Sequence, residues 1–360
     1  MKDIFTAPFV EEMRKTTANM YRLGWDERNG GNISWMLDEN EVGEYLDLNN
    51  VIRTIPLGFD ATAIIGKIFI VTGTGKYFKN VNDDPETNLG IVRIGSDGKT
   101  AELLWGYSDG GKFTSEFPAH LMSHMARLSV DPENRVVMHC HPTHTLAMNY
   151  VHELDEKKFT HTLWEMCTEC IVVFPDGVGV LPWMLCGTNT IGEATAEKMK
   201  EFRLVVWGMH GIYGAGKTMD ETFGLIETVE KAAQIFMLTA HLPRINTIKD
   251  EEMVELAEFF GVKYRKDFLV QIIDCFSNIH LHGIFLLILC MADQPASAQD
   301  SYNHPSSPHV LFPCVIHHSS IYLNLSVKFP SSPNTSLASK GLPSFFFSLT
   351  FPSVSPFLSI

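Results

Sequence analysis

Basic residues are scarce in this chain of 360 residues, which has 28 Lys and Arg against 42 Asp and Glu and a formal net charge of -14. A protein that binds nucleic acid needs clustered Lys and Arg to replace the counterions of the phosphate backbone. We therefore expect no DNA or RNA partner. The hydrophobic content of 45% is sufficient for a large buried core, so most of the chain should be globular.

Long apolar runs are also missing. The first fifteen residues mix acids and bases and lack the apolar core of a signal peptide, so we expect a cytoplasmic protein. The most apolar stretch, residues 283–292, is too short to span a bilayer, which argues against a membrane partner. Seven cysteines, an odd and scattered set, are not the dense even framework of a secreted scaffold, and reduced thiols are the simpler interpretation.

Charge nearly disappears in the last quarter of the chain. Residues 267–360 contain six of the 70 charged side chains and are rich in Ser, Pro and Phe, without sustained helical or strand periodicity. We therefore predict a domain at residues 1–266 and a tail at 267–360 that is not folded with the core and is of doubtful origin. Truncation after about Arg265 should leave activity and thermal stability intact.

Strands and helices alternate in residues 1–266. A stripe formed by Val10, Met13, Met20 and Leu23 predicts an amphipathic helix that ends at Gly24. Runs typical of strands occur at residues 67–72, 135–140, 170–174 and 204–209. Two Thr–Glu pairs, Thr190 with Glu193 and Thr218 with Glu221, fit the capping box of a helix start. These signals predict a mixed α/β domain, and the chain has no internal repeat.

Two histidines, His139 and His141, lie at the end of the strand predicted at 135–140. Residues i and i+2 of a strand point to the same face, so His139 and His141 should point together while Cys140 points into the layer behind. His210 ends another strand-like run. Three His from strand ends at one sheet edge would form a zinc site with an open position. The alternative is that each His is an ordinary core or surface residue, as we expect for His120, His124, His144, His152 and His161.

Cys167 and Cys170 form a C-x-x-C pair. A structural zinc would need a second pair at a suitable spacing, and the sequence has none. A redox role would need a helix start near a thioredoxin-like unit. Two small thiols packed beside a strand are the favoured interpretation, and Glu169 between them is the more interesting residue.

Residues 211–218, GIYGAGKT, satisfy the P-loop formula between a predicted strand and a predicted helix. On this interpretation the protein would be an NTPase that depends on Lys217. A P-loop fold also needs later strands to supply the magnesium-binding Asp. Only about fifty ordinary residues follow before the charge break, so a chance match is the competing explanation.

Three loops could hold a phosphate group. Thr114 and Ser115 precede a predicted helix start with Pro118 in its first turn, where free amides and the helix dipole favour an anion. The Gly-rich segments 29–32 and 72–76 offer further backbone amides. Together they suggest a phosphorylated substrate, although each alone could be an ordinary turn.

These motifs, in their order and spacing, resemble the rhamnulose-1-phosphate aldolases of the zinc-dependent class II aldolase and adducin-like superfamily. The resemblance covers about residues 5–265. It is carried by the blocks at 25–32 (WDERNGGN), 72–80 (TGTGKYFKN), 115–120 (SEFPAH), 138–141 (MHCH), 163–184 (LWEMCTECIVVFPDGVGVLPWM) and 210–234 (HGIYGAGKTMDETFGLIETVEKAAQ).

The resemblance implies a single α/β domain around a mixed, largely antiparallel sheet flanked by helices, and a homotetramer with sites near subunit contacts. It implies Zn2+ on His139, His141 and His210 and an acid/base at Glu116, with Glu169 near the aldehyde end. The phosphate would be held by residues that are spread over the three loops: Asn29, Gly31, Asn32, Thr74, Gly75, Thr114 and Ser115. Lys217 departs from the family pattern, which tends to have a non-basic residue there. The resemblance therefore implies that the P-loop match lies in a plain turn.

The implied reaction is the reversible retro-aldol cleavage of L-rhamnulose 1-phosphate to dihydroxyacetone phosphate and L-lactaldehyde in rhamnose catabolism. Zinc would act as a Lewis acid, and Glu116 would protonate C3. A related class II aldolase or a pentulose-phosphate 4-epimerase would share the metal site and the phosphate loops. A non-catalytic adducin-like module should lack the three His, and a P-loop NTPase remains the alternative from another class.

Overall fold

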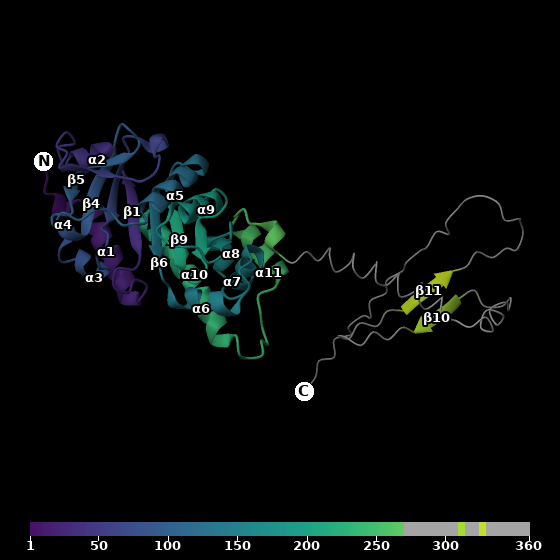
Figure 1. Cartoon of the computed structure of the whole chain (residues 1–360). Helices are drawn as coiled ribbons and strands as arrows, with labels where there is room; N and C mark the ends of the chain where they lie inside the picture. Colours follow the sequence, from purple (N-terminus) through teal and green to yellow (C-terminus); the bar gives the residue numbers. More distant parts are fainter. Residues whose placement is uncertain (270–308, 314–323, 329–360) are drawn as a thin grey trace, which may run out of the picture. The chain divides into compact units, whose positions relative to one another are not determined.

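The computed structural model describes residues 1–269, 309–313 and 324–328 (Figure 1). The chain divides into two units, Met1–Gln271 and Ile272–Ile360. In the second unit, β10 (His309–Pro313) pairs antiparallel with β11 (Asn324–Lys328). The apolar stretch 283–292 and most of the predicted tail lie outside the described residues, so the expectation for the tail stays a prediction. No helix among the described residues is long and apolar enough to cross a membrane.

The first unit is built on a nine-stranded open sheet with the order β2-β5-β4-β3-β1-β6-β9-β8-β7. Every neighbouring pair is antiparallel except β7 with β8. The strands are β1 (Asn32–Leu37), β2 (Arg53–Pro56), β3 (Ile68–Thr72), β4 (Leu89–Ile94), β5 (Thr100–Gly106), β6 (Val136–Cys140), β7 (Val178–Leu181), β8 (Leu204–Trp207) and β9 (Gly211–Gly216).

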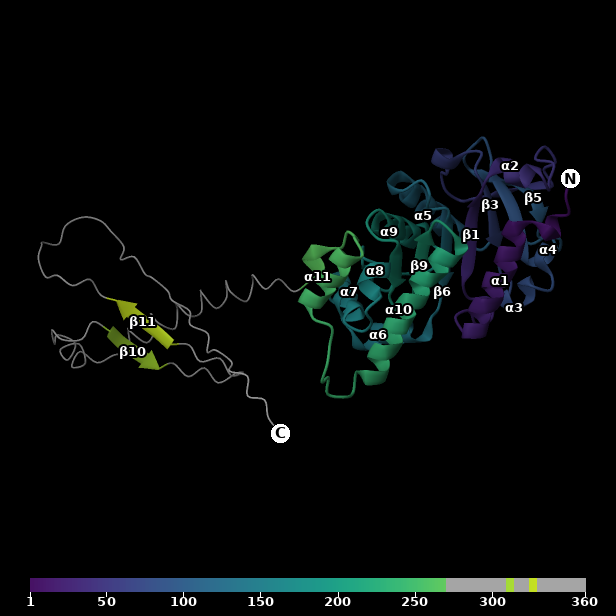
Figure 2. The ribbon, with the colours of Figure 1, turned by 180° about the vertical axis from the view of Figure 1, so that it is seen from behind.

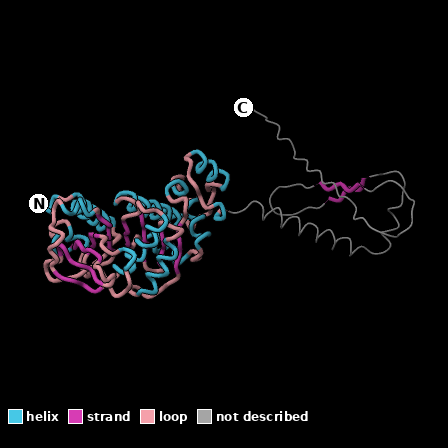
Figure 3. Tube along the Cα trace, turned by 90° about the horizontal axis from the view of Figure 1, so that it is seen from above, coloured by secondary structure: helices cyan, strands magenta, loops and turns pink. Residues whose placement is uncertain are grey.

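The first unit has eleven α-helices among its described residues. Figures 1 and 3 show helices packed around the sheet. They are α1 (Pro8–Leu23), α2 (Glu39–Gly43), α3 (Phe78–Val81), α4 (Pro85–Asn88), α5 (Phe117–Val130), α6 (Thr143–Val151), α7 (Glu156–Trp164), α8 (Cys170–Val173), α9 (Asn189–Met199), α10 (Met219–Thr239) and α11 (Asp250–Phe259).

Alternate residues of the central strands enter different cores. Ile33, Met138 and Cys140 pack with α1, α7 and α10 on one face of the sheet. In Figure 2 this face, with α1 and α10, is turned toward the viewer. On the other face, α5 and α9 cover the sheet, and Val137 lies among their apolar side chains. Because a strand side chain changes face at every residue, this register directs His139 to the α5 side and Cys140 away from it. The predicted fold class is confirmed.

Most predicted elements are present. The first helix begins at Pro8 and ends at Gly24, which adopts the left-handed conformation (φ 77°) that glycine tolerates. Thr218 caps α10 by accepting a hydrogen bond from the Glu221 amide, which is one half of the predicted capping box. The Glu221 carboxylate accepts from the Lys217 amide instead of the Thr218 amide. The other predicted box is wrong, because α9 begins at Asn189, so that Thr190 already lies within the helix.

The strand predicted at 170–174 is wrong. Residues Cys170–Val173 form the short helix α8, with Cys170 and Ile171 buried. A run of β-branched residues favours a strand, but the preference is weak and packing overrides it. Here the segment packs against α10 and α11 rather than against a strand.

The P-loop interpretation is also wrong. Gly211–Gly216 forms β9, which is hydrogen-bonded to β6 on one side and to β8 on the other, and is neither a phosphate loop nor the plain turn that the resemblance implied. Its glycines permit close packing: a Cβ on Gly214 would lie 2.9 Å from Ile226 of α10. Lys217 is exposed and forms an ion pair with Glu133 at the surface.

The boundary predicted at 266/267 falls too early. Phe268 is buried and packs against Trp164 and Phe202, and Arg265 stacks on its ring. Removing a buried Phe side chain typically costs about 3–5 kcal/mol of stability. A truncation after Arg265 would therefore open the core, and one that preserves the core must retain residues through Leu269.

Candidate active site

A row of polar side chains crosses the middle of the sheet. Asn32 of β1 lies opposite His139 of β6, and His139 lies opposite Tyr213 of β9. Residues in register on neighbouring antiparallel strands project to the same face. The His139 ring accordingly stacks on the Tyr213 ring, with 4.6 Å between centroids. This row faces the start of α5, which brings Glu116 onto it.

His210 reaches this row through a tight connection between β8 and β9. Trp207 pairs with Gly211, and the His210 amide donates to the Trp207 carbonyl across the turn. Met209 adopts a positive φ of 56°, which is uncommon for a residue other than glycine. A Cβ on Gly211 would lie 2.4 Å from the Cys140 carbonyl and 3.0 Å from the His139 ring. Glycine is therefore required for the close approach of β9 to the histidines.

His139, His141 and His210 offer three ring nitrogens that lie within 4.8 Å of one another. The other ring nitrogen of two of them is already used: His139 Nδ1 donates to the Ile212 carbonyl (3.1 Å), and His141 Nδ1 donates to the Glu27 carboxylate (3.1 Å). Their Nε2 atoms are buried and have no hydrogen-bond partner among the described residues.

This arrangement fits a metal ion. A metal-bound histidine usually donates its second nitrogen to a carbonyl or a carboxylate, which fixes the ring and leaves the other lone pair for the metal. Burial lowers the pKa of His139 well below its ordinary value and that of His210 to about 4, with the neighbouring His141 as a further cause for both. The neutral imidazole that a metal requires is therefore the dominant form near neutral pH.

Glu116 is the acidic group beside this cluster. It is the residue before α5, and its Oε2 lies 3.7 Å from His139 Nε2. Oε2 accepts hydrogen bonds from Asn32 Nδ2 (2.9 Å) and from the Tyr213 hydroxyl (3.3 Å), whereas Oε1 has no partner among the described residues. Burial raises the pKa of Glu116, and the two hydrogen bonds partly oppose this shift. A carboxyl group with a raised pKa is suited to exchange a proton near neutral pH.

Cys186 also lies at this site. Its sulfur, a Glu116 oxygen and a His210 nitrogen lie within 4.8 Å of one another. The residue is exposed and its thiol is free. The C-x-x-C pair is not part of the site: Cys167 donates to Glu169 (2.8 Å), and Cys170 is buried in the core.

The three predicted phosphate loops meet beside Asn32, at one end of the polar row. The amide of Ile33, next to Asn32, donates to the Thr72 hydroxyl (3.1 Å) at the end of β3. The Thr114 amide donates to the Thr72 carbonyl, and the Thr74 amide donates to the Lys112 carbonyl. Segments that are separate in the sequence are therefore held together by backbone hydrogen bonds.

Not every predicted phosphate residue has free groups. The amides of Thr74 and Thr114 are used between the loops, and the Thr114 hydroxyl accepts from the Glu116 amide. Among the described residues, the amides of Asn29, Gly31, Gly75 and Ser115 have no hydrogen-bond partner. The Asn32 side chain is already engaged by Glu116 and His120.

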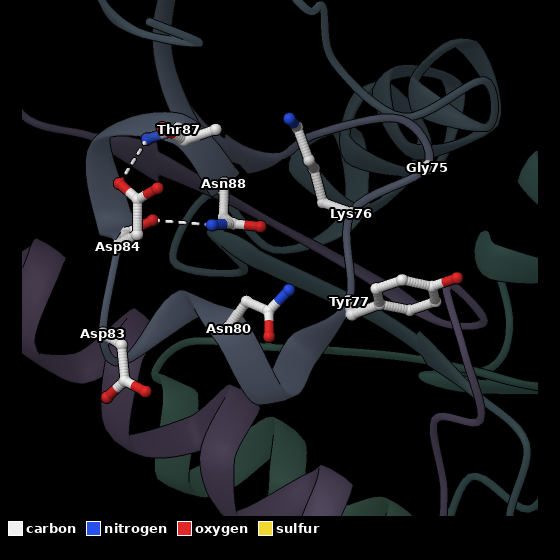
Figure 4. A pocket seen from close by; sticks show the side chains of 8 residues that line it. All are labelled: Gly75, Lys76, Tyr77, Asn80, Asp83, Asp84, Thr87 and Asn88. Atoms are coloured by element: carbon white, nitrogen blue, oxygen red, sulfur yellow. Dashed lines mark hydrogen bonds between the residues drawn. The ribbon is translucent and has the colours of Figure 1, made fainter. Parts of the chain in front are cut away.

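Two further features lie away from the histidines. Glu169 is exposed at the start of α8, whose Cys170 packs in the core on the far face of the sheet from α5, so this chain does not bring Glu169 to Glu116. A cavity of about 410 Å³ adjoins the loop at Gly75 (Figure 4). It is lined by Gly75, Lys76, Tyr77, Asn80, Asp83, Asp84, Thr87 and Asn88, which include none of the predicted metal ligands.

Several residues of the site carry no local sequence signal. Glu27 contacts His141, Tyr213 contacts Glu116, and Cys186 lies near both Glu116 and His210. His120 contacts Asn32, and Ser34 contacts His120. Glu27 lies in a quoted motif, WDERNGGN, but no spacing rule links it to His141, which is 114 residues away. His120 and His124 are buried as predicted for structural residues, but they are linked to the site.

Three histidines that could hold a metal ion lie beside a buried carboxylate on an open, largely antiparallel sheet. This arrangement fits a lyase of the aldolase class. The class II aldolase and adducin N-terminal domain matches residues 11–237. The chain belongs to the class II aldolase family, and it is an enzyme, an aldolase.

The chain is similar to proteins named rhamnulose-1-phosphate aldolase. It is 63% identical to that of Listeria monocytogenes serotype 4b, over 74% of this chain and 98% of the relative. It is 47% identical to that of Escherichia coli O81, over 73% of this chain and 97% of the relative. A solved sugar-phosphate aldolase from Thermotoga maritima superposes with a TM-score of 0.57 at 30% identity, over 66% of this chain and 97% of the other.

The hydrogen bond from His141 to Glu27 generates a prediction about metal affinity. His141→Ala should lose bound metal, because two His make a poor site. Glu27→Ala should retain the metal but bind it about 10- to 100-fold more weakly, since the carboxylate orients the His141 ring. The measurement is metal content by mass spectrometry together with chelator competition.

His241→Ala is the matched control, because His241 is exposed and lies outside the site. It should bind metal like the unchanged protein. Undiminished metal affinity in both Glu27→Ala and His141→Ala would contradict the assignment of the site.

Proposed function

We propose that the chain is a zinc-dependent aldolase that cleaves L-rhamnulose 1-phosphate reversibly into dihydroxyacetone phosphate and L-lactaldehyde. The single observation that carries the chemistry is the pair of buried, unpartnered Nε2 atoms of His139 and His141, with His210, beside Glu116. Support for the substrate comes from relatives named rhamnulose-1-phosphate aldolase, which are 47–63% identical over nearly their whole length.

Zinc suits the donor set because three histidines with one open position form a common catalytic zinc site. When bound there, zinc would supply Lewis-acid stabilisation of negative charge on substrate oxygens. The chain itself contributes the fixed rings of His139 and His141, whose second nitrogens are held by the Ile212 carbonyl and by Glu27.

Glu116 would move the proton. Its Oε2 is held by Asn32 and Tyr213, which leaves Oε1 to face the substrate. In cleavage the C4 hydroxyl would lose its proton to solvent as the C3–C4 bond breaks, and the electron pair of that bond would pass to C3. The Glu116 carboxyl group would then give its proton to C3 and take up another from solvent. In synthesis the same carboxylate would remove that proton, as microscopic reversibility requires. Burial raises the pKa of Tyr213 well above its ordinary value, so its hydroxyl stays a donor to Glu116.

The phosphate group would be bound by the free amides of Gly31, Gly75 and Ser115, at the edge where the three loops meet. Ser115 directly precedes Glu116, so a phosphate bound there would bring the carbon skeleton toward the carboxylate. The hydroxyls of Thr74 and Thr114 are further candidates from the same loops.

Three expectations stay predictions: the homotetramer, the cytoplasmic location and the role of Glu169. Glu169 lies in the layer on the other face of the sheet from α5, so it has a role in this chemistry only if a neighbouring chain presents it. The resemblance to tetramers with sites near subunit contacts is the support for that arrangement.

A substrate panel tests the proposed function. Zinc-loaded protein should cleave L-rhamnulose 1-phosphate with a kcat/KM well above its values for L-fuculose 1-phosphate and for pentulose phosphates, measured by enzymatic reduction of the dihydroxyacetone phosphate released. Chelation should abolish the activity and added zinc should restore it. A clear preference for another ketose phosphate would retain the aldolase chemistry and overturn the proposed substrate.

Glu116→Gln tests the proton step separately. This variant should retain zinc, because the three His are unchanged, and should lower turnover by about a hundred- to ten-thousand-fold. The readout is deuterium exchange from solvent at C3 of dihydroxyacetone phosphate, a half-reaction that needs no aldehyde. Exchange at the unchanged rate in a zinc-loaded Glu116→Gln protein would show that another group is the base.

A further inference from the structure

A chain of buried hydrogen bonds connects β1 and α5 and ends on Glu116. His124 Nε2 contacts Ser34 Oγ (2.8 Å), and Ser34 Oγ contacts His120 Nδ1 (2.8 Å). His120 Nε2 contacts Asn32 Oδ1, and Asn32 Nδ2 donates to Glu116 Oε2 (2.9 Å). Ser34, His120 and His124 are completely buried, so these polar groups have no access to water.

The two elements interlock because their repeats match. Residues two apart on a strand are separated by about 6.6 Å and share a face, and residues four apart on a helix rise by about 6 Å along one side. Asn32 and Ser34 therefore alternate with Glu116, His120 and His124 along a single line.

The donors in this chain have one consistent direction. Ionised Glu116 can only accept, so the Asn32 amide must present its N–H to it and its carbonyl to His120. His120 then carries its proton on Nε2, and its Nδ1 accepts from the Ser34 hydroxyl. The Ser34 oxygen in turn accepts from His124 Nε2. This leaves His124 Nδ1 as an acceptor at the far end, and it is buried without a partner among the described residues.

Neutral histidines agree with this direction. Burial lowers the pKa of His120 well below its ordinary value, with nearby His124 as a further cause, and it lowers the pKa of His124 to about 3. A neutral ring has one donor and one acceptor, which is what each link needs. A reversed chain would turn the Asn32 carbonyl toward the Glu116 carboxylate and leave an unpaired N–H at His124. A buried orphan N–H is the rarer arrangement in proteins.

We propose that Ser34, His120 and His124 are positioning residues that lock the Asn32 amide with its N–H on Glu116 Oε2 and so leave Oε1 directed at the substrate carbon. The inference rests on the proposed acid/base role of Glu116. None of the three residues touches the substrate in this account, and their effect passes entirely through Asn32.

Removing one hydroxyl tests the chain. In Ser34→Ala the proton of His120 is free to move to Nδ1, and the Asn32 amide then loses its fixed orientation. Because the hydrogen bond from Asn32 to the charged Glu116 is weakened, kcat and the rate of C3 exchange should both fall by about 10- to 100-fold. KM and zinc content should remain nearly unchanged. Ser34→Thr retains the hydroxyl and should recover most of the loss.

Ser123→Ala is the matched control. Ser123 lies on α5, is equally buried, and bonds only to the Ala119 carbonyl within its own helix. Removing its hydroxyl should leave kcat unchanged.

A second pair of variants, at position 120, replaces Ser34→Ala if that variant folds poorly. His120→Gln retains an N–H donor for the Asn32 carbonyl, and His120→Leu does not. His120→Gln should therefore have the higher kcat per bound zinc.

A double variant separates this inference from the proposed function. If Ser34 acts only through Glu116, Ser34→Ala should slow exchange in the parent protein but not further in Glu116→Gln. Unchanged exchange in Glu116→Gln alone would overturn the role of Glu116. Two outcomes would overturn the positioning chain and leave the proposed function intact. One is full loss of exchange in Glu116→Gln with parental kcat in Ser34→Ala. The other is an equal loss from Ser34→Ala in both backgrounds.

Discussion

The structure depends on the register of β6 between β1 and β9. That register aligns Asn32, His139 and Tyr213 in one row on one face. A shift by one residue in β6 would turn His139 into the apolar core and bring Cys140 to the site. The register is held from both faces, because Val137 packs with α5 and α9 while Met138 and Cys140 pack with α1 and α10. Core packing and site geometry are therefore specified by the same contacts.

The site retains polar atoms that folding alone does not satisfy. The Nε2 atoms of His139 and His141 are buried without partners among the described residues, and an unpartnered buried polar atom typically costs about 1–3 kcal/mol. Met209 adds a positive φ at the turn that delivers His210. These local costs are offset by the apolar cores on both faces of the sheet. A bound metal would satisfy the lone pairs, so metal binding should stabilise the folded chain.

Much of the fold and of the ligand set could be predicted from local patterns. His139 and His141 follow from the period of a strand, and α1 and α10 follow from their caps. Residues 170–174 were misassigned because their β-branched run is packed as a helix against α10 and α11, a tertiary effect without a local signal. The match to the P-loop formula misled for a similar reason. Gly214 and Gly211 allow the close approach of α10 and of the Cys140 carbonyl, which become neighbours only in the folded chain.

The supporting residues lie beyond local patterns for the same physical reason. Glu27 meets His141, and Ser34 meets His120 and His124, across more than eighty residues of sequence. What joins them is the match between strand and helix repeats, which appears only after β1 and α5 pack together.

We propose that the imidazoles of His139, His141 and His210 alone hold the metal, and that the exposed thiol of Cys186, which lies near His210, does not. X-ray absorption at the zinc edge of the purified holoenzyme measures this directly. The account predicts three nitrogen ligands from protein at about 2.0–2.1 Å with only light oxygen atoms completing the shell. A sulfur ligand at about 2.3 Å, or fewer than three imidazoles, would contradict it.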